Sequence, residues 1–306
     1  MAMMIPNSFR ERYVPILGAK NREFLRFCEL PLKKTIRINT LKVENPLEYA
    51  KSLKERGWIL EKIPWCDYAY NVEGIEPGKT EDYFYGKIYI QEAASILPSL
   101  ALNPKETDFV MDMCAAPGSK TTHLAQLMKN RGCIVANDTS YQRIKALMFN
   151  LELTGSLNVV VTEMDATRLN IEDRFDRILI DAPCSCEGTI RKNWKALSRW
   201  HPKVCRFMGS RQKALLKVGA RALKPGGTII YSTCTLAPEE NEAVVDYGIN
   251  KIGLSVEKVD IKGLKTSECV TEWEKEKYDE EVKKCARIWP QDNDTEGFFV
   301  AKLKKP

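Results

Sequence analysis

The sequence predicts an α/β fold in which helices cover a mostly parallel sheet, preceded by a smaller α+β domain. From about Asp108 onward, short apolar runs alternate with amphipathic helical patterns, as in doubly wound folds. Several of the apolar runs end in an acidic residue, at the sheet edge where α/β proteins bind ligands. With 306 residues, 44% of them hydrophobic, the chain is long enough for one large core and one small one.

The alternation sets the order of the expected elements. The expected strands are FVMDM (109–113), CIVAND (133–138), NVVVTEMD (158–165), FDRILIDAP (175–183) and TIIYSTCT (228–235). The expected helices are TTHLAQLMKN (121–130), YQRIKALMFNLELTG (141–155) and a long basic helix before the last strand. We therefore assign residues 96–306 to the α/β domain.

The first 95 residues show a different pattern. KKTIRINTLK (33–42) and GKIYIQ (86–91) are typical of strands, and NPLEYAKSLKERGW (45–58) predicts a helix that starts near Asn45 or Pro46. We assign residues 1–95 to a small α+β accessory domain. Near the other end, the mixed-charge stretch 266–284 is expected to be a solvated helix or an excursion.

Composition excludes several classes of protein. No run approaches the ~20 apolar residues of a membrane span, and the N-terminus has no signal-like stretch, so we expect a cytoplasmic protein. Ten cysteines in such a protein are expected to be reduced. We expect no metal site, because the two histidines and the cysteines lack zinc-binding spacing.

The segment from Asp112 to Thr121 links an expected strand to an expected helix and is rich in small residues, which allow a ligand close to the backbone. It lacks both the G-x-G-x-x-G pattern and the P-loop pattern. Asp138 ends the next strand and is placed to accept hydrogen bonds from ribose hydroxyls, and Asp165 can contact an adenine amino group in the same way. A helix N-cap is the alternative for any one such Asp.

Two cysteines follow expected strands. Cys184 lies in DAPCSCEG and Cys234 in YSTCT, and adjacent strands would direct both into one cleft. Buried core cysteines are the alternative, which we retain for Cys114, Cys133, Cys186 and Cys205 as far as side-chain chemistry is concerned.

These blocks resemble a known family. CAAPGSK, DAPCSCEG and YSTCT, supported by IYIQEAAS (88–95) and RIWPQDNDTEGFFVA (287–301), are similar to the motifs of the NSUN (Nop2/Sun) family of RNA cytosine-5 methyltransferases. The resemblance spans residues 85–302 and implies a Rossmann-like domain that uses S-adenosylmethionine. It implies that Cys234 is the nucleophile and that Cys184 assists product release. It also implies that Asp181 holds the base and that Lys120 reaches the base from the cofactor loop. The implied cofactor contacts are Cys114, Ala115, Ala116, Pro117, Gly118, Ser119, Lys120, Asp138, Arg143, Asp165 and Asp181.

The chemistry requires groups of this kind. Carbon 5 of cytosine is a poor nucleophile, and addition of a thiolate to carbon 6 makes it enamine-like. Negative charge then develops on the ring, and a protonated Asp181 or the Lys120 ammonium would offset it. A free thiol has a pKa of roughly 8.5, so Cys234 needs a positive neighbour such as Lys120.

The substrate is expected to be RNA. The stretch after Gly188 up to Lys217 holds nine Lys or Arg and no acid, with Trp194 and Trp200 between them. Arg191, Lys192, Trp194 and Lys195 are the expected RNA contacts, and the eight basic residues between Arg10 and Arg37 are expected to extend the groove. A solvated basic helix is the alternative.

The compact chain resembles the archaeal tRNA-modifying members of the family, which favours tRNA as the substrate and a monomer as the active form. The same chemistry on rRNA remains open. Less favoured are a DNA cytosine-5 methyltransferase that uses Cys184, whose E-N-V block is missing, and a non-catalytic RNA-binding factor, against which the presence of both cysteines, Asp181 and Lys120 speaks.

Overall fold

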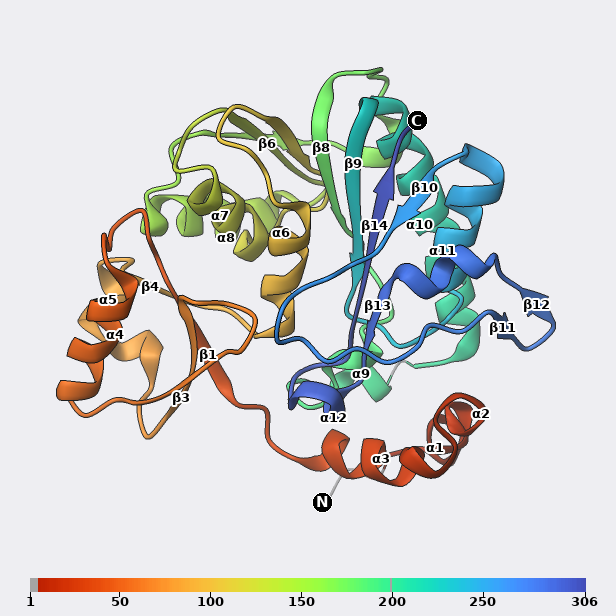
Figure 1. The fold of residues 1–306 in the computed structure, drawn as a ribbon, viewed down its shortest axis with the longest axis horizontal. Coiled ribbons are helices and arrows are strands. Elements are labelled where there is room, and N and C mark those ends of the chain that lie inside the picture. The colour runs from red at the N-terminus through yellow and green to blue at the C-terminus, as the bar shows by residue number, and fades with distance from the viewer. Residues whose placement is uncertain (1–4, 199) are drawn as a thin grey trace.

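The computed structural model describes residues 5–198 and 200–306 and contains a large and a small sheet with separate helical layers (Figure 1). The large sheet is eight-stranded, and the small sheet is four-stranded and precedes it in the chain. The predicted fold class, a mostly parallel Rossmann-like sheet with a small N-terminal α+β part, is confirmed.

The large sheet has the order β10-β14-β9-β8-β5-β6-β7, with β13 paired to β14. The strands from β9 to β7 in this order pair in parallel, whereas β10, β13 and β14 add antiparallel pairs at one side. The strand bounds are β5 Phe109–Asp112, β6 Cys133–Asp138, β7 Val159–Glu163, β8 Phe175–Asp181, β9 Leu223–Thr233, β10 Ser255–Glu257, β13 Ala286–Ile288 and β14 Phe298–Lys304.

Helices cover both faces of this sheet (Figure 1). Alternate residues of one strand point to opposite faces, so Leu179 of β8 packs with the residues of α6 and α7, whereas Ile178 and Ile180 pack against α10. Both faces are therefore apolar, as a parallel sheet requires. The helix bounds are α6 Leu97–Leu102, α7 Ser119–Leu127, α8 Tyr141–Thr154, α10 Pro202–Ala222 and α11 Glu242–Tyr247.

The small sheet is antiparallel with the order β2-β3-β1-β4. Asn45 caps α4, since its side chain accepts hydrogen bonds from the backbone N–H groups of Leu47 and Glu48. The predicted strands β1 and β4 and the helix α4 are confirmed, whereas β2 and β3 were not expected. The bounds are β1 Lys34–Ile38, α4 Pro46–Glu55, β2 Ile59–Lys62, β3 Ala69–Glu73, α5 Glu81–Phe84 and β4 Ile88–Ile90.

The three N-terminal helices do not pack with the small sheet. Phe9, Tyr13 and Phe24 join Trp289 and Leu236 in one apolar cluster, with ring centroids 5.3 Å apart between Trp289 and both Tyr13 and Phe24. The first helices are thereby attached to the carboxyl edge of the large sheet. The bounds are α1 Asn7–Arg12, α2 Val14–Leu17, α3 Asn21–Glu29, α9 Lys195–Ser198 and α12 Pro290–Asn293.

The mixed-charge stretch 266–284 is an excursion that contains a hairpin of β11 Glu272–Trp273 and β12 Glu276–Lys277 rather than an α-helix. Trp273 and Tyr278 of this segment are buried in the core that residues of α10 and α11 also form. These two side chains hold the segment against the surface of the domain. No helix in the described part of the chain combines the length and the apolar content needed to cross a membrane.

The structure contradicts the prediction that Arg191 contacts RNA. Its side chain is 1% exposed and donates to the carbonyls of Leu30, Pro31 and Thr295 and to Asp294 Oδ1, at 2.7 Å for the last. Burial therefore makes Arg191 a link between the end of α3 and the turn after α12. Arg12 and Arg37 of the expected N-terminal basic groove are also buried.

We expect Arg191→Ala to lower the free energy of unfolding by about 2 kcal/mol. This value is below the full cost of breaking a buried ion pair, because Asp294 is half-exposed and water can solvate it. Urea unfolding curves provide the measurement. The matched control is Lys192→Ala, an exposed neighbour whose removal should change stability by less than about 0.5 kcal/mol. Wild-type stability in Arg191→Ala would contradict a structural role for this side chain.

Candidate active site

Two adjacent parallel strands end side by side at the candidate site. In the register of β8 and β9, Asp181 lies opposite Ser232, whose hydroxyl donates to Asp181 Oδ1 at 2.9 Å. The chain continues from these positions into the loops that carry Cys184 and Cys234. The expectation that both cysteines reach one cleft therefore agrees with the geometry.

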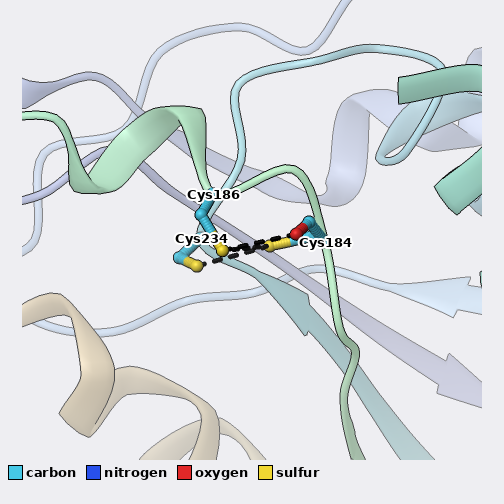
Figure 2. Close-up of side chains that lie close together, drawn as sticks. All are labelled: Cys184, Cys186 and Cys234. Carbon is cyan, nitrogen blue, oxygen red and sulfur yellow. Dashed lines mark hydrogen bonds between the residues drawn. The ribbon is translucent and has the colours of Figure 1, made fainter. Parts of the chain in front are cut away.

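The sulfur atoms of three cysteines lie together beyond the strand ends (Figure 2). Cys184 Sγ is 3.3 Å from Cys234 Sγ and 3.9 Å from Cys186 Sγ. Each of the three is partly exposed, unlike a core cysteine such as Cys205. No local pattern predicted that Cys186 would join this group.

Gly188 allows the two loops to approach closely. Its backbone N–H donates to the Cys234 carbonyl at 2.9 Å, and its carbonyl accepts from the Gly297 N–H at 3.0 Å. A Cβ atom at position 188 would lie 2.0 Å from the Gly297 carbonyl oxygen and 2.8 Å from that of Cys234. Only glycine fits here, and the loop of Cys184 is thereby held against the end of β9.

Lys120 reaches the same place from the first turn of α7. Its Nζ is 2.8 Å from Asp181 Oδ2 and 3.0 Å from the hydroxyl of Ser95. Burial opposes the positive charge, but the nearby Asp181 carboxylate outweighs it and raises the pKa of Lys120. A fixed ammonium therefore stands beside the thiols.

The thiols influence one another's ionisation. Hydrogen bonds with Cys186 and Cys234, together with burial, raise the pKa of Cys184 well above its ordinary value. The pKa of Cys234 is also raised: the hydrogen bond with Cys184 lowers it, but Cys186 and burial outweigh that effect. A single negative charge shared within the group is favoured over two, because like charges repel at this distance.

A cavity of about 450 Å³ opens beside the cysteines. Asp138, Asp165 and Asp181 line it from the ends of successive strands or just beyond them, and Arg143 pairs with Asp138 at 3.2 Å. The predicted contacts that line the cavity are Cys114, Asp138, Arg143, Asp165, Asp181, Cys184 and Cys234. The acidic lining suits a cationic ligand, and the size suits a nucleoside, so the residues present fit S-adenosylmethionine.

The remaining predicted loop residues, Ala115 to Ser119, do not line the cavity but form its support. The Ala116 N–H donates to Asp138 Oδ2 at 3.2 Å, and its carbonyl accepts from Arg143. Gly118 has φ +108° and packs on Leu147, which a side chain at 118 would strike. Ala116 therefore holds Asp138 and Arg143 in place through its backbone.

Two carboxyl groups that the large and small parts of the chain bring together, Glu92 and Glu296, lie near Lys120. Glu92 accepts from the backbone N–H groups of Ser95 and Glu296, and Glu296 Oε1 has no hydrogen-bond partner within the described ranges. Burial raises the pKa of both carboxyls. Their motifs, QEAAS and DTEGF, carried no predicted role, since nothing local shows that the two carboxyl groups meet.

Glu187 is a second residue that the sequence analysis missed. It is 1% exposed and accepts hydrogen bonds from Tyr13 of the N-terminal helices, Trp200 Nε1 and the Thr235 hydroxyl. Thr235 also bonds the hydroxyl of Ser185 at 2.7 Å. The loop that carries Cys184 and Cys186 is thus tied both to the loop of Cys234 and to the N-terminus.

The other expected RNA contacts lie at the surface. Lys192, in the turn before α9, and Lys195, at the start of α9, are exposed, and Trp194 is half-buried against the N-terminal aromatic cluster. They follow the cysteine loop directly in the chain. Their role in RNA binding remains a prediction.

Comparison with known proteins places this site in a family. A family profile described as 16S rRNA methyltransferase RsmB/F matches residues 99–304, and a profile for the N-terminal domain of 16S rRNA methyltransferase RsmF matches residues 5–93. The tRNA (cytosine(49)-C(5))-methyltransferase of Pyrococcus abyssi is 45% identical over 97% of this chain and 95% of its own length. The ribosomal RNA small subunit methyltransferase F of Vibrio parahaemolyticus is 38% identical over 98% of this chain, which spans only 63% of that relative.

Solved structures agree with this placement. A methyltransferase homolog protein from Pyrococcus horikoshii superimposes with a TM-score of 0.84 at 35% identity, covering 97% of this chain and 94% of that one. NSun6 from Pyrococcus horikoshii, solved with SFG, also has a TM-score of 0.84, at 25% identity and 98% coverage of both chains. The chain therefore belongs to the RsmB/F (NOL1/NOP2/Sun) family of S-adenosylmethionine-dependent methyltransferases.

Proposed function

We propose that this protein methylates carbon 5 of a cytosine in tRNA. The observation that carries the proposal is the pair of thiols 3.3 Å apart, Cys184 and Cys234, beside the Lys120–Asp181 ion pair. Two thiols next to a fixed cation suit a reaction that adds a nucleophile to the base and later removes a proton from it.

The choice of tRNA is supported by likeness over the whole length. The tRNA-modifying relative matches nearly end to end, whereas the rRNA-modifying relative extends well beyond the region it shares with this chain. rRNA is retained as the alternative substrate, because both matching family profiles are described by 16S rRNA. We infer further that the enzyme acts as a monomer in the cytoplasm.

Cys234 is the proposed nucleophile. Its thiolate forms a bond to carbon 6, and the ring electrons move toward carbon 5, which then takes the methyl group. Asp138, Arg143 and Asp165 would hold S-adenosylmethionine in the cavity, where it would supply that methyl group and leave as S-adenosylhomocysteine. Lys120 and Asp181 contact the pyrimidine and offset the negative charge that develops on it.

Cys184 has the proposed second role. The carbon 5 proton must leave before the bond between carbon 6 and Cys234 Sγ can break, and Cys184, or a base that it activates, takes it. Elimination then returns Cys234 to its thiolate form. Because the two sulfurs lie close together, one of them can keep the proton while the product leaves.

In the proposed division of the chain, residues 1–95 form an accessory RNA-binding part and residues 96–306 form the catalytic part. Lys192, Trp194 and Lys195 are the proposed RNA contacts of the catalytic part, with the lysines on phosphates and the indole stacked on a base. The target cytosine has to leave any stack, since carbon 6 is attacked from the ring face.

We expect Cys234→Ala to abolish methylation of unfractionated tRNA, because no thiolate is then left to activate carbon 5. Cys184→Ala should instead accumulate a protein–RNA adduct that survives denaturing gel electrophoresis. Cys133→Ala, a partly exposed thiol on β6, is the matched control and should keep wild-type activity without an adduct. An active Cys234→Ala variant combined with an inactive, adduct-free Cys184→Ala variant would reverse the two roles.

We also expect the Lys192→Ala/Lys195→Ala double variant to bind tRNA more weakly, with the slope of log affinity against log salt reduced by about 2, since two phosphate contacts are lost. Filter binding over a series of salt concentrations measures the slope. Lys129→Ala, an exposed lysine after the far end of α7, should leave it unchanged. An unchanged slope in the double variant would place the RNA on another surface.

A further inference from the structure

We propose that Cys184, Cys186 and Cys234 form a binding site for a thiophilic divalent cation such as Zn²⁺ or Cd²⁺. Linear spacing led to the expectation of no metal site, because the only two histidines, His123 and His201, do not stand in a zinc-binding spacing. The fold nevertheless brings the three Sγ atoms within 4.8 Å of one another (Figure 2). Among residues 5–198 and 200–306, this is the one group of three or more potential side-chain ligands at that spacing.

The sulfur spacing is close to what such an ion needs. Zinc binds thiolates at about 2.3 Å in a tetrahedral arrangement, which places the sulfurs about 3.8 Å apart. The 3.9 Å between Cys184 and Cys186 matches this value, whereas the 3.3 Å between Cys184 and Cys234 has to open by about 0.5 Å. Small rotations of partly exposed side chains are sufficient for that change.

The backbone at Cys186 directs its thiol into the group. Cys186 has φ +61°, in the left-handed region that residues with a side chain rarely adopt. The turn lets the thiol fold back, so that its sulfur lies 3.3 Å from the Cys184 carbonyl oxygen. Glu187, the next residue, fixes the turn through its buried hydrogen bonds.

The surroundings suit the charge of an occupied site. Three thiolates and one divalent ion carry a net charge of −1, and the cationic side chains of Lys120 and Arg143 lie nearby to offset it. All three cysteines line the cavity, so water can take a fourth position on the ion. Three protein ligands with one open position differ from the closed four-ligand arrangement of structural zinc sites, and this site is accordingly expected to exchange its ion.

Occupation of the site would block the proposed reaction, and this part of the inference rests on the proposed function. A thiolate bound to the cation is a weaker nucleophile, because the cation withdraws electron density from the sulfur and occupies the space from which carbon 6 would be attacked. Thiophilic cations would therefore inhibit methylation reversibly, and a chelator would restore it.

The binding test uses the full chain, reduced and free of metal, titrated with Cd²⁺. Ultraviolet thiolate-to-cadmium charge transfer reports the number of bound sulfurs, and calorimetry gives the affinity. Wild type should bind one ion through three thiolates and release protons as it does so. Cys184→Ser, Cys186→Ser and Cys234→Ser should each lose one third of the absorption. Each should also weaken binding by more than the ~10–100-fold that loss of an outer-shell partner costs.

Cys133→Ser is the matched control, and it should titrate like wild type. Equal absorption and affinity in wild type and Cys186→Ser would overturn the proposal, as would a signal lost only in Cys133→Ser. Circular dichroism of each variant checks that a lost signal does not result from unfolding.

The inhibition test compares each protein with itself, with and without Zn²⁺. Methylation by wild type should fall with Zn²⁺ and return on addition of EDTA, and Cys186→Ser should require at least ~10-fold more Zn²⁺ for the same fractional loss. Equal sensitivity of the two proteins would contradict the blocking role. A wild type that binds Cd²⁺ but never methylates tRNA would refute the proposed function and leave the metal site standing.

Discussion

The parallel pairing of β8 with β9 is the constraint on which the site depends. It sets Asp181 opposite Ser232, and the loops that leave both strands then carry Cys184 and Cys234 into contact. A shift of one residue in this register would turn Asp181 away from Ser232 and move the cysteines apart. Lys120 completes the arrangement from the first turn of α7, which follows the neighbouring strand β5, and pairs with Asp181.

Buried polar side chains hold the loops beyond the sheet. Glu187 accepts hydrogen bonds from Tyr13 of the N-terminal helices, from Trp200 and from Thr235 of the Cys234 loop. Arg191 connects the end of α3 to the turn after α12. Glu240 accepts from the Ser185 N–H at 3.0 Å, and burial raises its pKa to about 7. The N-terminal helices therefore support the active site, although the whole small sheet lies between them and the large sheet in the sequence.

The sequence was informative wherever the signal is local. Apolar alternation identified the five parallel strands of the large sheet but not β10, β13 and β14, and short motifs pointed to Asp181, Cys184 and Cys234, because each of these signals depends on neighbouring residues only. Glu187 and Tyr13 are 174 positions apart, and Glu92 and Glu296 are 204 positions apart, so no local pattern shows their contacts. Arg191 was misjudged for the same reason: a run of basic residues has the same appearance whether one member is buried or exposed.

The most direct test of the central claim uses tRNA in which 5-fluorocytidine replaces cytidine. Fluorine at carbon 5 cannot leave as the proton does, so the adduct between the base and the enzyme persists after methyl transfer. The account predicts a denaturation-resistant complex whose RNA-linked peptide, identified by mass spectrometry, contains Cys234. Attachment at Cys184, or methyl transfer to the fluorinated base without any covalent complex, would contradict it.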